Sequence, residues 1–122
     1  MSPAPEWRDY LAAVVDAMRK AMRFTEGMDY AAFAVDDKTT FAVIRALEIV
    51  GEATKKIPES VRALHTEIPW RAMSGMRDKL IHDYTGVNLE VVWRTVQQDL
   101  PALCARLEPL LDDRATGSPN DP

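Results

Sequence analysis

Arg77 and His82 stand five positions apart in the segment RDKLIHDY, which spans residues 77–84. Histidine takes up and releases protons near neutral pH. Arginine stays charged and presents a planar fork of donors that matches phosphate oxygens. A phosphate clamp and a proton carrier in one short segment would suit chemistry on a phosphodiester, and Arg77 and His82 are the residues that could carry it.

The residues around this motif belong to a wider pattern. They are Ile49-Val50-Gly51-Glu52-Ala53 upstream, Pro69-Trp70 just before the motif, and Tyr84-Thr85-Gly86-Val87 at its end. With the R-x4-H-x-Y spacing of the motif, these segments resemble the HEPN-domain ribonucleases and, among them, the HepT branch, the toxins paired with MntA-type nucleotidyltransferase antitoxins. The resemblance extends from about residue 7 to about residue 111, nearly the whole chain.

The resemblance implies a specific activity and a specific regulation. The expected protein is a homodimeric, metal-independent endoribonuclease, a toxin whose two motifs line a shared cleft. A cognate MntA-like nucleotidyltransferase antitoxin would neutralise it by transferring AMP to Tyr84. No cofactor and no metal ion are expected.

RNA cleavage of this kind makes three chemical demands. A proton must leave the ribose 2′-OH, the phosphorane must be stabilised, and the departing 5′ oxygen must be protonated. Arg77 and His82 supply groups for these steps. Asp78, four residues before His82, would favour and orient the protonated imidazole, and Lys79 and Arg45 are candidates for further phosphate contacts.

Composition limits the class of protein. With 122 residues, of which 47% are hydrophobic, the chain fits one domain with its own core. A formal net charge of -4 argues against binding RNA through the overall field, so the contact must be local. No apolar run is long enough to span a bilayer, and the first residues lack a secretion signal, so a cytoplasmic protein is expected. The lone cysteine, Cys104, lies on an apolar stripe and is expected to be a core residue.

Helical periodicity runs through the chain and predicts an all-α fold. Four main helices are expected, from Trp7 to near Gly27, from about Asp37 to Lys56, from Trp70 to about Tyr84, and from Asn88 to about Leu111, with short helices between them. The resemblance implies that they form a HEPN-type up-and-down bundle. Residues 1–6 would be an N-terminal arm, residues 7–111 the domain, and residues 112–122 a disordered tail.

Three local features refine these helices. Gly51 costs about 1 kcal/mol relative to alanine inside a helix, so another backbone is expected to approach there. Phe41 is expected on the apolar side of the second helix with Ile44 and Leu47, and the charges from Arg45 to Lys56 are expected to form a solvated face. Pro101 removes a hydrogen bond from the last helix and predicts a kink.

The motif raises a geometric question. On one straight helix, Tyr84 projects along the same side as Arg77, whereas His82 projects about 140° away from it. Either the last turn distorts before Gly86, or a second protomer brings its motif across a two-fold axis. The resemblance implies the second arrangement.

Less specific interpretations are also open. Tyr84 could be the last residue of a core stripe, His82 a surface histidine paired with Asp78, and Arg77 a salt-bridge partner across a dimer. At the level of function, the chain could be a non-catalytic HEPN-type module that binds a nucleotidyltransferase, or a helical accessory protein unrelated to RNA. His65 has no partner at metal-ligand spacing beyond Glu67, so a surface role is expected for it.

Overall fold

The structure is a computed structural model that describes the backbone of residues 6–83 and 86–112, and the side chains of residues 6–80 and 86–112. It confirms the all-α fold, with one short hairpin as its β structure in the described part. The helices are α1 (Trp7–Phe24), α2 (Tyr30–Ala34), α3 (Asp37–Lys55), α4 (Glu59–Arg62), α5 (Trp70–Ser74), α6 (Met76–Leu80), α7 (Leu89–Arg94) and α8 (Leu100–Asp112), with a π-helical turn, η1 (Thr95–Asp99), before α8.

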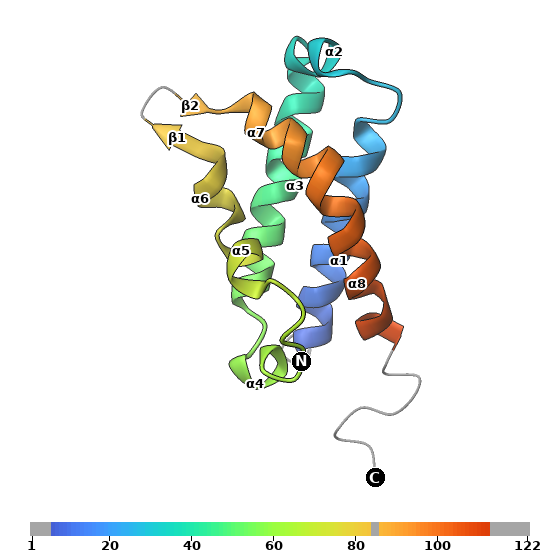
Figure 1. Cartoon of the computed structure of the whole chain (residues 1–122), viewed down its shortest axis with the longest axis vertical. Helices are drawn as coiled ribbons and strands as arrows, with labels where there is room; N and C mark the ends of the chain where they lie inside the picture. The colour runs from blue at the N-terminus through green and yellow to red at the C-terminus, as the bar shows by residue number, and fades with distance from the viewer. Residues whose placement is uncertain (1–5, 84–85, 113–122) are drawn as a thin grey trace, which may run out of the picture.

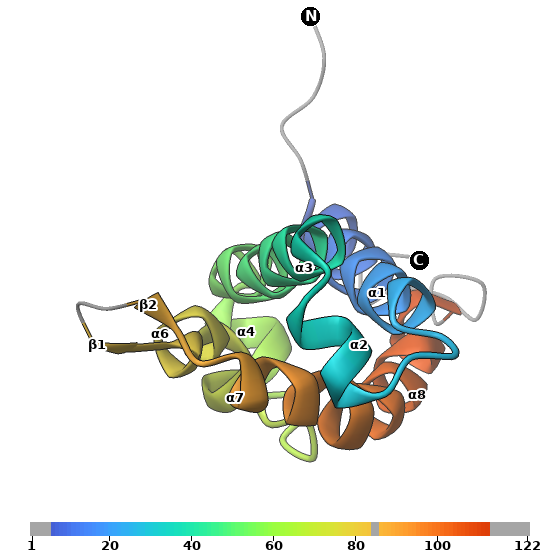
Figure 2. The same cartoon turned by 90° about the horizontal axis from the view of Figure 1, so that it is seen from above.

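The long helices form a bundle in which α1 lies between α3 and α8 (Figure 1). On its other side, α3 packs against α5 and α6. Seen from above, α2 covers one end of the bundle, and the hairpin projects from the side that carries α6 (Figure 2). None of the helices in the described ranges has the length and apolar character needed to cross a bilayer.

Polar caps fix where the helices begin. The Asp36 carboxylate accepts the backbone N–H of Thr39 at 3.0 Å at the start of α3. The Asn88 side chain accepts two N–H groups, from Glu90 and Val91, at the start of α7. Each cap satisfies donors that have no partner within the helix, so these residues define the helix starts that the sequence predicted.

The core fills the space between α1, α3, α5–α6 and α8. Its fully buried large side chains include Leu11, Met18, Phe33, Leu47, Met73, Leu80, Leu100 and Leu107. Phe33 contacts Trp93 with ring centroids 5.2 Å apart, so α2 is joined to α7 through aromatic packing. The Trp70 indole N–H donates to the His65 carbonyl at 2.9 Å, which ties the segment before α5 to the core.

The motif segment differs from the prediction. The single helix expected from Trp70 to about Tyr84 is wrong, because the helix is interrupted at Gly75 and ends at Leu80. Residues Ile81–Asp83 form strand β1, which pairs antiparallel with β2 (Gly86–Val87). Gly86 has φ +125°, a conformation that residues with a side chain avoid, so this glycine opens a strand instead of ending a helix.

The last helical region is also irregular. The π-turn η1 widens the helix immediately before Pro101, with the Leu100 N–H bonded to the carbonyl of Thr95 five residues earlier. The kink at Pro101 stays a prediction. The Thr95 hydroxyl donates to the Val91 carbonyl at 2.8 Å. A wider turn relieves the clash between the proline ring and the preceding turn and accommodates its missing N–H, which accounts for an irregularity at this place.

Candidate active site

Arg77 stands in α6 at the point where this helix meets α3. The contact is close because Gly51 carries no side chain: a Cβ built there would lie 3.3 Å from the Ser74 carbonyl oxygen and 3.5 Å from the Arg77 nitrogen. The predicted approach of another backbone at Gly51 is therefore confirmed. It fixes the backbone of Arg77 directly against α3.

The side chain of Arg77 contacts an acidic residue of α3. Its Nε lies 3.8 Å from Oε2 of Glu48, and Oε1 of Glu48 lies 3.7 Å from Nη1 of Arg45. The same Arg45 nitrogen lies 3.5 Å from Oε1 of Glu52. Arg77, Glu48, Arg45 and Glu52 thus form a row of alternating charges across α6 and α3, which we name the α3–α6 charge row.

The charge row contributes little to the stability of the fold, and its main effect is to position the side chains of Arg77 and Arg45. Its pairs are solvent-exposed to a large degree, with 53% of the Arg77 side chain and 29% of the Glu48 side chain accessible, and such pairs contribute at most about 1 kcal/mol each. The Glu48 contact with Arg77 runs through Nε. It leaves the two terminal nitrogens of the guanidinium to other acceptors, and these are the donors that form a bidentate pair with a phosphate.

His82 belongs to strand β1 of the hairpin. The base of this hairpin is closed by a backbone hydrogen bond from the Asn88 N–H to the Leu80 carbonyl, 3.1 Å long, and by the pairing of Ile81 with Val87. The hairpin therefore leaves the bundle and returns to it at one place, between the end of α6 and the start of α7 (Figure 1). The imidazole lies outside the described side chains, and Tyr84 lies outside the described residues.

The other two predicted site residues of α6 occupy different places. Asp78 is exposed, and the helical relation that was expected to bring it beside His82 is wrong, because the chain leaves the helix after Leu80. The Lys79 Nζ lies 3.5 Å from Oδ2 of Asp99 in η1, on the side of α6 that faces α8. The structure thus brings Arg45 near Arg77 through Glu48, whereas Lys79 is directed elsewhere.

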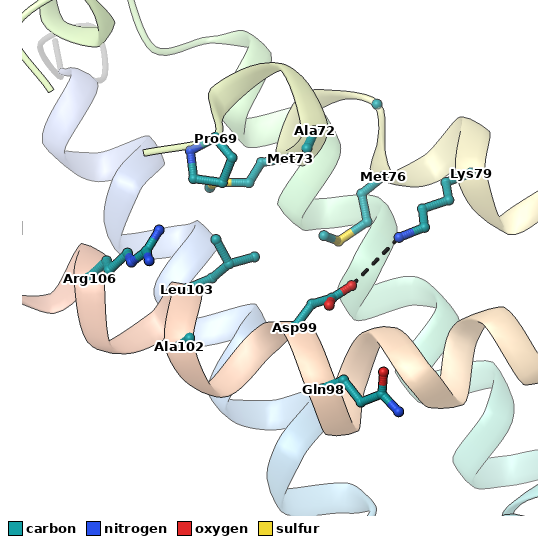
Figure 3. A pocket seen from close by; sticks show the side chains of 11 residues that line it. Pro69, Ala72, Met73, Met76, Lys79, Gln98, Asp99, Ala102, Leu103 and Arg106 are labelled. Atoms are coloured by element: carbon teal, nitrogen blue, oxygen red, sulfur yellow. Dashed lines mark ion pairs between the residues drawn. The ribbon is translucent and has the colours of Figure 1, made fainter. Parts of the chain in front are cut away.

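Lys79 and Asp99 lie at one edge of a groove between α5–α6 and η1–α8 (Figure 3). The groove has a volume of about 480 Å³ and an apolar floor. Its lining residues are Pro69, Ala72, Met73, Gly75, Met76, Lys79, Gln98, Asp99, Ala102, Leu103 and Arg106. Arg77 is not among them, so the groove is separate from the α3–α6 charge row.

Two other residues that could carry chemistry, His65 and Cys104, lie in surroundings that do not form a site. The His65 imidazole Nδ1 lies 3.7 Å from a Glu67 oxygen, and no group of three metal-ligating side chains occurs among the side chains described, those of residues 6–80 and 86–112. Cys104 is buried as predicted, and desolvation by this burial raises the pKa of its thiol above the ordinary value. The thiol is therefore held in its neutral, unreactive form.

The surroundings of two residues of α3, Glu48 and Phe41, differ from those that the sequence predicted. Glu48 was assigned to a solvated face, although it is the residue that contacts Arg77. The signal was present, because a close backbone approach at Gly51 places the residue one turn earlier beside the same neighbour. Phe41 was expected in the core and is 77% exposed, because it projects about 200° from Val43, a fully buried residue of α3.

The fold and the motif together define a helical bundle of the HEPN type. The family model described as "Ribonuclease HepT-like" matches residues 14–110. The chain therefore belongs to the HepT-like ribonuclease family.

Relatives of known name support this assignment. The "Probable ribonuclease HepT" of Thermococcus cleftensis is 50% identical over 103 residues, which cover 84% of this chain and 94% of the relative. A protein of Methanocaldococcus jannaschii with a provisional RNase name is 38% identical over 91% of this chain and 96% of its own length. A further such protein, from Caldanaerobacter subterraneus, is 36% identical over 85% of this chain and 93% of its own length. No solved structure matches the chain significantly.

Proposed function

We propose that this protein is a metal-independent endoribonuclease in which Arg77 and His82 carry the reaction. Membership of a ribonuclease family supports the substrate class. The observation that supports the site is the contact between Arg77 and Glu48, because it holds the guanidinium beside α3 in the short helix that ends where the motif hairpin begins. Cytoplasmic RNA is the proposed target.

The chemistry follows from the two side chains. The ribose 2′ oxygen attacks phosphorus while a base, assigned to a motif histidine, removes its proton. The bond from phosphorus to the 5′ oxygen breaks, and a protonated histidine supplies the proton that this oxygen needs. Arg77 stays charged throughout and stabilises the extra negative charge on the phosphorane. The products are a 2′,3′-cyclic phosphate and a free 5′-hydroxyl.

We further propose that two protomers form the working site. One histidine cannot serve at once as the base and as the acid, and a two-fold axis would supply a second motif to the same cleft. Light scattering should then give a mass near twice 13.7 kDa. A monomer with full nuclease activity at micromolar concentration would contradict this arrangement.

The proposed regulation concerns Tyr84, two residues after His82. An MntA-like nucleotidyltransferase antitoxin would join AMP from ATP to the tyrosine hydroxyl, releasing pyrophosphate. The added phosphodiester brings negative charge and bulk beside the motif, which would compete for Arg77 and repel the RNA backbone. Intact mass spectrometry after co-expression should detect an adenylyl group that is absent in Tyr84→Phe. Neutralisation of an unmodified toxin would leave steric blockade as the mechanism.

The catalytic proposal is tested with purified protein and total RNA. Arg77→Ala and His82→Ala should each lower cleavage by a hundredfold or more, since acid–base groups contribute about 10² to 10⁴. Arg71→Ala is a matched control, because it removes an exposed arginine of α5 that lies outside the charge row. Cleavage should persist in excess EDTA and leave cyclic phosphate ends. Activity that is lost on chelation and restored by a divalent metal would refute the mechanism.

A further inference from the structure

Phe41 is an aromatic residue on the outer face of α3. It is 77% exposed, and the other exposed large apolar residues in the described ranges lie in different elements: Phe24, Val35 and Leu64. Phe41 stands one helical turn before Arg45 and two turns before Glu48 on the same face. Its Cα is therefore about 10 Å along the axis from that of Glu48, whose carboxylate contacts Arg77.

Charged side chains surround this ring. Lys38 is exposed at the position three residues earlier, and the exposed Arg45 lies four residues later. The acidic neighbours are Asp37 at the start of the helix and Glu48 within the charge row. The ring is thus an exposed apolar surface between two cations. Lys38 lies within one turn before it, and Arg45, which also contacts Glu48 and Glu52, lies one turn after it.

We propose that Phe41 is a stacking platform for an unpaired nucleobase of the RNA whose phosphate is held at Arg77. The inference rests on the proposed ribonuclease function and adds a second contact to it. Every base has a π-face, so stacking holds a single strand without selecting its sequence. Flanking cations suit the phosphates on either side of the stacked base. In a protein with net charge -4, such a local site supplies affinity that the overall field does not.

An interface between copies of the chain explains this surface less well. A stable protein interface buries about 800 Å² on each partner, whereas a single aromatic side chain supplies about 150–250 Å². The residues at one-turn spacing along this face, Arg45, Glu48 and Glu52, are charged. A large apolar contact centred on Phe41 is therefore not favoured, while one planar base matches the ring in size.

The experiment measures binding of a short, fluorescently labelled single-stranded RNA with 2′-O-methyl groups, which cannot react by 2′-OH attack. Phe41→Ala should weaken binding by about fivefold to a hundredfold, the range expected for one stacked base. Phe41→Trp should restore binding close to the unmutated level. Val35→Ala is the control, because Val35 is 82% exposed but lies on the connection between α2 and α3. Its affinity should be unchanged.

The salt dependence and a modified strand separate stacking from charge effects. Phe41→Ala should keep the slope of log Kd against log salt, whereas Arg45→Ala should reduce it by about one contact. On a strand whose stacked nucleotide lacks its base, the unmutated protein and Phe41→Ala should bind equally.

Three results would overturn the inference: Phe41→Ala binding as tightly as the unmutated protein, its mass by light scattering falling to that of a monomer, or the unmutated protein failing to bind the strand. The proposed function fails on a different measurement, the absence of RNA cleavage by the unmutated protein. If Phe41→Ala cleaves and binds RNA normally, the stacking inference is refuted and the proposed ribonuclease function is not affected.

Discussion

Replacement of Gly51 by alanine tests whether the close contact between α3 and α6 positions Arg77. The added methyl group would lie 3.3 Å from the Ser74 carbonyl oxygen and 3.6 Å from that of Met73, so the backbone of α5 or α6 must move by a few tenths of an ångström. Overpacking of this kind costs about 1–3 kcal/mol. The better helix propensity of alanine returns about 1 kcal/mol. We expect a net loss of about 1 kcal/mol.

A loss of that size lowers the melting temperature by about 4 °C in a domain of this length. The catalytic effect should be larger in proportion, because a displacement of about 1 Å can cost about a hundredfold in rate. A shift of a few tenths of an ångström at Arg77 should therefore lower kcat by about tenfold. RNA cleavage is measured at a temperature well below the melting temperatures of the unmutated protein and of Gly51→Ala.

Gly27→Ala is the matched control for this experiment. Gly27 has φ +76°, and no atom lies within 4 Å of a Cβ built there, so alanine costs about 1–2 kcal/mol through backbone strain alone. Gly27 lies between α1 and α2, away from the contact of α3 with α6. The control should lose stability and keep its activity. If Gly51→Ala is as stable and as active as the unmutated protein, the close approach does not position Arg77 for cleavage.

Two substitutions test the helix caps, and one chemical modification tests the buried thiol. Asn88→Ala removes the acceptor of two N–H groups and should lower the free energy of unfolding by about 1 kcal/mol in urea titrations, whereas an unchanged midpoint would contradict the cap. Hydrogen bonds from Thr39 lower the pKa of Asp36, so its stabilisation is present above the unfolded pKa and is lost as the pH falls through the lower folded value. Asp36→Asn caps without ionising, and its melting temperature should fall less steeply below about pH 4. Burial raises the pKa of Cys104, so a thiol reagent at pH 8 should modify the native protein far more slowly than the urea-unfolded chain, and equal rates would show that the thiol is accessible.

The sequence predicted correctly those helices whose ends are marked by a capping residue or a glycine. The starts of α3 and α7 follow acidic or amide caps, and α1 ends before a glycine of positive φ. Between such ends, apolar residues that recur every three or four positions are explained by an amphipathic helix. The buried residues of α1 and α8, which form much of the core, follow the same helical spacing.

The motif segment was predicted less well because two signals competed there. Met73, Met76 and Leu80 have helical spacing and are buried. Beyond Leu80, the β-branched Ile81 and Val87 enclose the hairpin and pair with each other across it. β-branched residues favour strands, and Gly86 takes a backbone conformation that a continuous helix cannot contain. Strand pairing therefore overrode the helical pattern at the point where His82 stands.

This change of structure alters the geometric problem that the motif poses. On a straight helix, Arg77 and His82 would diverge by about 140°, and a second protomer would be the simplest way to bring the two types of side chain together. In the structure, Arg77 is fixed by α3 through Gly51 and Glu48, whereas His82 stands on a hairpin whose base is closed by the hydrogen bond from Asn88 to Leu80. In the proposed site, a guanidinium on a packed helix would give the phosphate a fixed position. Under the proposed regulation, the nucleotide would be added two residues after His82 in the sequence, whereas Arg77 is held by α3. The modification would then act beside the proposed proton carrier and leave the packing of the bundle unchanged.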